Sequence, residues 1–164
     1  MKNIFVILLA IIIIVPISAF SQKNKANKET EQWRYETEDL GVIGQQGTSV
    51  FKVWTYSKKE TIAITQASKN AVHAILFKGY GSNKPLVRDA SIMESREDFF
   101  KDFFRDGGDF QRFVQLSNNG AISAGDRVKV GKEYKIGLKV IVRKDDLRKY
   151  LEEKGIIKAM NSMF

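Results

Sequence analysis

The chain of 164 residues contains no cysteine, two prolines and a single histidine. The lack of cysteine excludes disulfides, thiol catalysis, cysteine-ligated zinc and a lipid-modified N-terminal cysteine. A single histidine has no partner at i+4, so a metal site built on paired histidines is excluded as well. Stability must therefore come from buried apolar side chains, and the 11 phenylalanines supply much of that surface.

Positive charge exceeds negative charge in the sequence. Lysine and arginine number 27 and aspartate and glutamate 19, which gives a formal net charge of +8 at pH 7. A basic protein outside the cell favours anionic envelope polymers or lipid head groups, and we expect no nucleic acid as a partner there. The alternative interpretation is a lysine-rich surface that serves solubility alone.

The first 21 residues have the pattern of a secretory signal. A short basic start is followed by an uncharged run over residues 4–20, and Ala19-Phe20-Ser21 fits the small-x-small rule of signal peptidase. We expect cleavage before Gln22 and export to the periplasm or the cell exterior. The alternative is an uncleaved anchor that associates with the membrane, because a helix over the uncharged run would reach ~25 Å against a hydrocarbon core of ~30 Å.

The mature chain divides into a leader and one domain. Residues 22–31, QKNKANKETE, are polar and lysine-rich, which predicts a disordered leader. Residues 32–164 suit a single domain with its own core. The apolar tail, IIKAMNSMF, is expected to pack back on that domain.

Apolar periodicity predicts an α+β layered domain with a mixed sheet and about three helices, in the order β-β-α-β-α-β-β-β-α. In residues 49–56, Phe51 and Val53 alternate with Lys52 and Trp54, so they face opposite sides of a strand. Strand, helix and strand over 49–80 predict a right-handed crossover between parallel strands. The expected strands are 33–37, 49–56, 73–80, 110–116, 128–130 and 134–142, and the expected helices are 57–72, 95–108 and 145–155.

Three local signals fix details of these elements. Ser57 and Glu60 have the spacing of a capping box at a helix start. Ala63, Ala67 and Ala71 form a stripe of small residues, which lets that helix lie close to the sheet. The segment Asn118-Asn119-Gly120 predicts a turn.

His73 and the loop from Gly79 to Lys84 are the candidates for an active site. An imidazole can serve a serine hydrolase as base, and a glycine-rich loop with a lysine can bind phosphate. The chain has no nucleophile-elbow pattern, however, and Pro85 follows Lys84 where a phosphate-binding loop would begin a helix. We therefore interpret His73 as a packed residue and the loop as a turn. A hydrolase or small-ligand-binding enzyme using both remains the alternative.

Pairs of acidic residues are candidates for calcium binding or acid–base catalysis. They lie at expected helix starts or on charged helix faces, where carboxylates serve capping and solvation. The segment DGGD also lacks the alternating acidic positions of a calcium loop. We predict no metal site, no cofactor and no catalytic residue. The pairs are Asp98 with Asp102, Asp106 with Asp109, and Asp145 with Asp146.

Four aromatic residues on two neighbouring expected strands are candidates for ligand binding. Trp33 and Tyr35 lie on the first strand, and Trp54 and Tyr56 lie on the second. If they share an exposed face, they form a platform for a sugar or a peptide. The alternative is that they belong to the core.

Three segments carry a resemblance to known families: VFKVWTYSKKETIAITQASKNAVHAILFKGY, FFKDFFRDGG and AGDRVKVGKEYKIGLKVIVRKDDLRKYLEEKGII. With them the chain resembles a family of secreted proteins of Bacteroidetes, from which no activity is carried over. Its element order is similar to that of the small domain of LPP20-type lipoproteins and flagellar assembly proteins. That resemblance implies an envelope-assembly module rather than an enzyme.

Together these features predict an exported, non-catalytic envelope protein with a binding or scaffolding role. The expected partner is an envelope component, either a protein or an anionic polymer. The candidate binding residues are Trp33, Tyr35, Trp54, Tyr56, His73 and Lys84.

Overall fold

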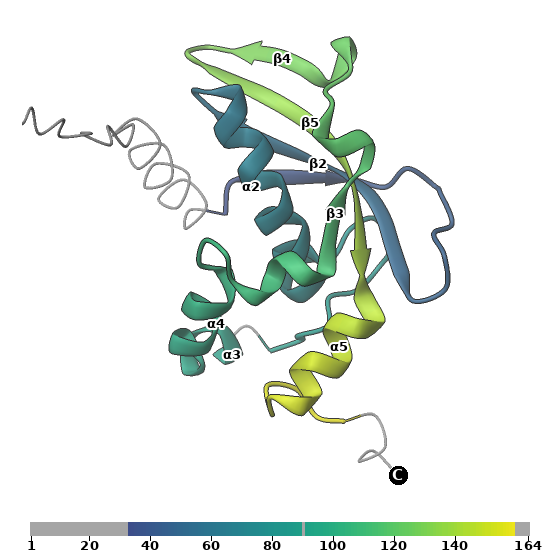
Figure 1. Cartoon of the computed structure of the whole chain (residues 1–164), viewed down its shortest axis with the longest axis vertical. Helices are drawn as coiled ribbons and strands as arrows, with labels where there is room; N and C mark the ends of the chain where they lie inside the picture. Colours follow the sequence, from purple (N-terminus) through teal and green to yellow (C-terminus); the bar gives the residue numbers. More distant parts are fainter. Residues whose placement is uncertain (1–32, 90, 160–164) are drawn as a thin grey trace, which may run out of the picture.

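The computed structural model describes residues 33–89 and 91–159, which form one α+β domain as the sequence predicts (Figure 1). The expected signal peptide (1–21) and leader (22–31) lie outside the described residues, and so does the end of the tail from residue 160. Within the tail, Ile156 is 7% exposed and belongs to the core, as expected.

The sheet has five strands, and every pairing between the described strands is antiparallel. The long strands β2 and β5 lie side by side at its centre, with β1 beyond β2. Both β3 and β4 pair with the other edge of β5, at opposite ends. The strands are β1 Tyr35–Glu38, β2 Thr48–Ser57, β3 Val114–Leu116, β4 Arg127–Val130 and β5 Glu133–Arg143.

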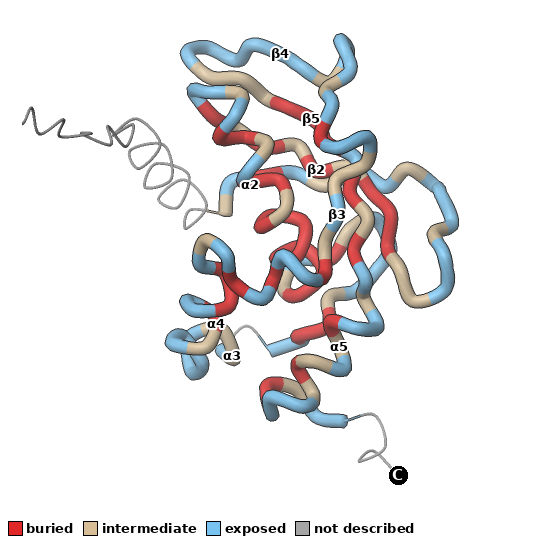
Figure 2. Tube along the Cα trace, viewed as in Figure 1, coloured by how far each residue is buried: buried red, intermediate tan, exposed pale blue. Residues whose placement is uncertain are grey.

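The helices share one core with one side of the sheet, and Figure 2 shows the buried residues concentrated along β2, β5 and α2. Phe51 and Val140 from the sheet are fully buried, with Phe103 from α4 and Leu147 from α5 in the same cluster. The expected alanine stripe of α2 is also fully buried, so this helix lies close to the sheet. The helices are α2 Glu60–His73, α3 Ser91–Ser95, α4 Glu97–Phe104 and α5 Lys144–Glu153.

The strand predicted over 73–80 is wrong, and with it the parallel crossover. Residues Ala74–Lys78 form a π-helical turn that continues α2 and ends at Gly79, whose φ is 78°. The returning chain uses the carbonyls at this helix end, since Leu86 N–H donates to Ile75 O and Val87 N–H to Leu76 O, each at 2.9 Å. A short apolar run fits a buried helical turn as well as a buried strand, so periodicity alone does not separate them.

Other element boundaries differ from expectation for local reasons. Ser57 is the fully buried last residue of β2, and its Oγ accepts from the Lys59 amide at 3.3 Å, so the predicted capping box does not form. Glu60 instead forms an ion pair with Arg127 at 3.3 Å. The expected strand 110–116 is shortened to β3, because residues Asp109–Phe113 form a 3₁₀ turn. The helix expected over 95–108 is shorter in the structure, where α4 spans Glu97–Phe104 and follows the short α3.

Candidate ligand-binding face

One side of the sheet carries none of the described helices, and we call it the open face. Along β2, Phe51, Val53 and Thr55 are buried beneath the helices, whereas Lys52, Trp54 and Tyr56 point the other way and are only half-buried. Val50, on the same side as these three, is buried. An antiparallel sheet tolerates water on one side, so an uncovered face needs no partner for stability. The central residues of the open face are Glu36 and Glu38 of β1, Lys52, Trp54 and Tyr56 of β2, and Lys135, Gly137 and Lys139 of β5.

Trp54 lies flat on the centre of this face. Its strand partner is Gly137, and a Cβ atom added to Gly137 would lie 2.9 to 3.0 Å from three atoms of the six-membered ring of Trp54. Three nearly equal distances mean that the ring presents its face, and not its edge, to the backbone. Gly137 has no positive φ, so glycine is required here by the close approach of the ring. The opposite face of the ring points away from the sheet.

Polar groups surround the Trp54 ring on the open face. The indole Nε1–H donates to Glu38 Oε2 at 2.7 Å. The ammonium groups of Lys52 and Lys135 each lie 5.2 Å from the ring centroid, within the range of cation–π attraction. The ring is therefore fixed at its edge by a carboxylate and flanked by two cations.

Tyr56 continues the open face one position along β2. Its hydroxyl donates to a Glu36 carboxylate oxygen, and Lys135 Nζ donates to the other carboxylate oxygen at 2.6 Å. These hydrogen bonds, from Lys135 first and Tyr56 second, lower the pKa of the Glu36 carboxyl. The guanidinium of Arg34 lies 4.5 Å from the Tyr56 ring and pairs with Glu133 at 2.7 Å. Most charges at this end of the open face are thus already paired.

Two lysines lie directly opposite each other at the other end. Lys52 and Lys139 are strand partners, and like charges in that position destabilise a sheet. Lys52 donates to Asp126 at 2.6 Å. Lys139 is exposed and has no hydrogen-bond or ion-pair partner among residues 33–89 and 91–159. The open face therefore contains an uncompensated cation next to the Trp54 ring.

Trp33 and Tyr35 do not lie on the same side of the sheet as Trp54 and Tyr56. The strand partner of Tyr35 is Thr55, so Tyr35 points into the core with Thr55 while Trp54 points out. Trp33 stacks on His73, with ring centroids 3.8 Å apart. The four aromatic residues thus form two groups on opposite sides of the sheet, and the platform that the sequence suggests consists of Trp54 and Tyr56.

His73 lies in the other aromatic group, at the end of α2. Its Nδ1 is 2.7 Å from the Tyr35 hydroxyl, and Trp33, Phe77 and Phe104 surround the imidazole. Burial, aided by the charge of Lys78, lowers the pKa of His73 to about 3, so the ring is neutral at physiological pH. No serine, threonine or carboxylate side chain among the described residues is hydrogen-bonded to His73.

The loop after the π-helical turn is a closed turn. The backbone groups of Tyr80 and Asn83 bond each other at 3.2 and 2.8 Å, and the Tyr80 ring stacks on Phe51 at 4.3 Å. Lys84 is exposed. No contact among the described residues joins it to His73, so these two candidate residues do not form one site.

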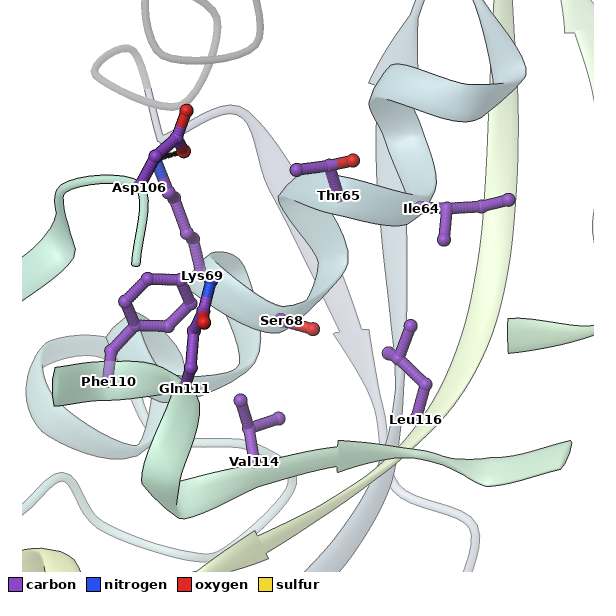
Figure 3. A pocket seen from close by; sticks show the side chains of 9 residues that line it. All are labelled: Ile64, Thr65, Ser68, Lys69, Asp106, Phe110, Gln111, Val114 and Leu116. Atoms are coloured by element: carbon purple, nitrogen blue, oxygen red, sulfur yellow. Dashed lines mark ion pairs between the residues drawn. The ribbon is translucent and has the colours of Figure 1, made fainter. Parts of the chain in front are cut away.

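A pocket of about 320 Å³ lies between α2 and the segment that leads into β3 (Figure 3). Its polar centre is Lys69, whose side chain is 4% exposed and whose ammonium lies 3.3 Å from an Asp106 carboxylate oxygen. The Thr65 hydroxyl at its rim donates to the Thr61 carbonyl at 3.1 Å. These two groups are engaged within the protein, and the remaining polar side chains in the lining are Ser68 and Gln111 beside an apolar wall. That wall includes Ile64, Phe110, Val114 and Leu116.

Neither a metal-binding cluster nor a membrane-spanning helix is found in the described part of the chain. No group of three or more acidic or histidine side chains there lies close enough together to hold a metal ion. Among the same residues, no helix combines the length and apolarity needed to cross a bilayer. Comparison with protein-family models, curated proteins and solved structures finds no match to this chain.

The sequence places Lys52, Trp54 and Tyr56 on one side of their strand and indicates the two aromatic residues as candidates for binding, but it does not identify the other residues of the open face. The signal that could have identified Gly137 is a lone glycine within the strand pattern of 134–142, since such a glycine often marks a close approach. No comparable signal exists for the opposed lysines Lys52 and Lys139. They are 87 residues apart in the sequence (139 minus 52), so their pairing depends on the register of two distant strands, outside the reach of local patterns.

Proposed function

We propose that this chain is a non-catalytic binding protein of the cell envelope that engages its partner through the open face. The observation that carries this proposal is the flat Trp54 ring, which covers Gly137 with one face and is only partly buried. An aromatic ring fixed in this way offers a large contact area at low cost in side-chain entropy. The expected signal sequence supports export, to the periplasm or beyond the cell.

The composition of the open face also supports binding over catalysis. Its carboxylates are engaged, Glu36 by Lys135 and Tyr56 and Glu38 by the Trp54 indole. The hydrogen bonds from Lys135 and Tyr56 lower the pKa of Glu36, which makes it a poor proton acceptor. No observation favours the alternative of an enzyme that uses His73 with the Gly79–Lys84 loop, because the imidazole is buried against Tyr35 and no serine, threonine or carboxylate of the described residues is bonded to it.

Retention on isolated envelopes tests this proposal. Protein from cells that express the full chain is mixed with washed envelope fragments of its host, and the bound fraction is measured after sedimentation. We expect Trp54→Ala to lower retention, while His73→Gln and Lys84→Ala retain the wild-type level. Equal retention of Trp54→Ala and wild type, with both folded by circular dichroism, would contradict a role for the open face. Loss only in His73→Gln would favour the enzyme alternative.

A further inference from the structure

We propose that the ligand of the open face is an acidic polysaccharide, with one sugar ring stacked on Trp54 and a neighbouring carboxylate held between Lys52 and Lys139. This inference rests on the proposed binding function and adds the chemical class of the partner. It combines two observations about adjacent positions on the sheet: a ring lying flat, and Lys139, a cation without an ion-pair partner among the described residues that lies opposite Lys52.

The geometry of the Trp54 ring suits a saccharide. Sugar rings have an apolar face of C–H groups that packs on an aromatic face, and a planar, outward-facing indole is the shape this contact needs. Glu38 and Lys135 border the ring. Both can hydrogen-bond the hydroxyls at the edge of a stacked sugar, because a carboxylate accepts and an ammonium donates.

The charges determine which kind of saccharide is favoured. Lys52 and Lys139 occupy the row next to Trp54 and Gly137, two residues along each strand, or ~7 Å away. Lys52 is already compensated, because Asp126 forms an ion pair with it and Glu38 is its other strand partner. A carboxylate arriving from outside would therefore compensate Lys139 and relieve its like-charge contact with Lys52. A polymer that carries its acid on the sugar next to the stacked one places a negative charge in this row.

Other occupants fit less well. A neutral polysaccharide would stack on Trp54 and leave Lys139 uncompensated. A polyanion without sugar rings, such as an acidic peptide, would reach the lysines and gain nothing from the flat ring. An anionic bilayer would insert exposed apolar residues beside the cations, and Val128 and Val130 of β4, the strand partners of Lys135 and Glu133, are exposed on this face. They lie away from the row of Lys52 and Lys139, so insertion there would make no use of the opposed lysines.

Binding to defined polymers tests the ligand class. Immobilised polygalacturonate is the probe, and dextran, polyglutamate and phosphatidylglycerol vesicles are the comparisons, each measured at low and at moderate salt. We expect polygalacturonate to bind most tightly. Trp54→Ala should weaken this binding about tenfold and Trp54→Phe much less, since phenylalanine keeps a stacking ring. Lys139→Gln should weaken it about threefold and reduce its salt dependence.

A matched control separates the opposed pair from general charge. Lys132→Gln removes the same charge from the exposed turn between β4 and β5, outside the row of Lys52 and Lys139, and should bind like wild type. Equal losses in Lys132→Gln and Lys139→Gln, or equal binding of polyglutamate and polygalacturonate, would overturn the proposal. So would stronger binding of dextran or vesicles, or no binding of polygalacturonate. If envelope retention still depends on Trp54 in any of these cases, the proposed function stands and only the acidic polysaccharide is rejected.

Discussion

At the scale of single residues, buried His73 makes the stability of the fold sensitive to acid. Burial and then Lys78 lower its folded pKa to about 3, whereas the unfolded chain takes up the proton near ~6.5. Between these values the unfolded state binds more protons, so stability is complete above ~6.5 and is lost as the pH falls below it. Tyr35, which faces the imidazole with its hydroxyl, stays neutral throughout that range because burial raises its pKa.

Replacing the imidazole tests this linkage. We expect His73→Gln to be less stable than wild type at pH 7, because the stacked ring is lost, and to lose less stability on going from pH 7 to pH 4.5. The slope contributed by one such histidine is up to about 1.4 kcal/mol per pH unit. Urea denaturation at several pH values gives the slope of unfolding free energy against pH for wild type and for His73→Gln. Subtracting one slope from the other removes the contribution of the carboxylates, which is common to both proteins. Parallel slopes would show that His73 titrates near its ordinary pKa.

Gly137 is the other residue whose role is specific enough to test. Its substitution by alanine normally suits a strand, but here the new Cβ would press on the Trp54 ring at 2.9 to 3.0 Å. We expect Gly137→Ala to destabilise the protein by about 1–3 kcal/mol and to displace the ring. Gly125→Ala is the matched control, since nothing lies within 4 Å of its added Cβ, and it should change stability very little. Thermal unfolding followed by circular dichroism measures both variants.

At the scale of elements, the distance of α2 from the sheet depends on its alanine stripe. Ala63, Ala67 and Ala71 are each fully buried. We expect Ala67→Leu to destabilise the protein by about 1–3 kcal/mol, because a larger side chain separates the helix from β2 and β5. Thr61→Leu places the same side chain on the exposed side of the helix and should be nearly neutral. The urea denaturation midpoints of the two variants measure these changes in stability. Equal effects of the two substitutions would argue against close packing at Ala67.

At the scale of the whole molecule, the layered arrangement leaves one side of the sheet without a helix, and the expected signal sequence predicts where the proposed partner would be found. We predict that the host contains a soluble exported species beginning at Gln22. Intact mass of the native protein, combined with cell fractionation, measures this directly. A membrane-bound species that retains Met1 would instead support the anchor, and the open face would then act near the membrane surface.

The sequence by itself determined what depends on local periodicity. Spacings within a few residues predict the α+β class, the alternation of buried and exposed residues along β2 and β5, the packing of α2 close to the sheet, and the final β-hairpin. They do so because the period of a helix or strand specifies which of its side chains lie on the same face. It also placed Trp54 and Tyr56 on the same side of one strand.

Only the tertiary structure decided which sides are covered and which residues meet. The run at 74–78 became helical because its end bonds residues 86 and 87 of the returning chain. Tyr35 separated from Trp54 because its register opposite Thr55 turns it into the core, and a shift by one residue would have reversed that outcome. The contact of Trp54 with Gly137 and the opposed lysines arise from strands far apart in sequence. Contacts of this kind depend on the packing of the whole domain, which no local pattern contains.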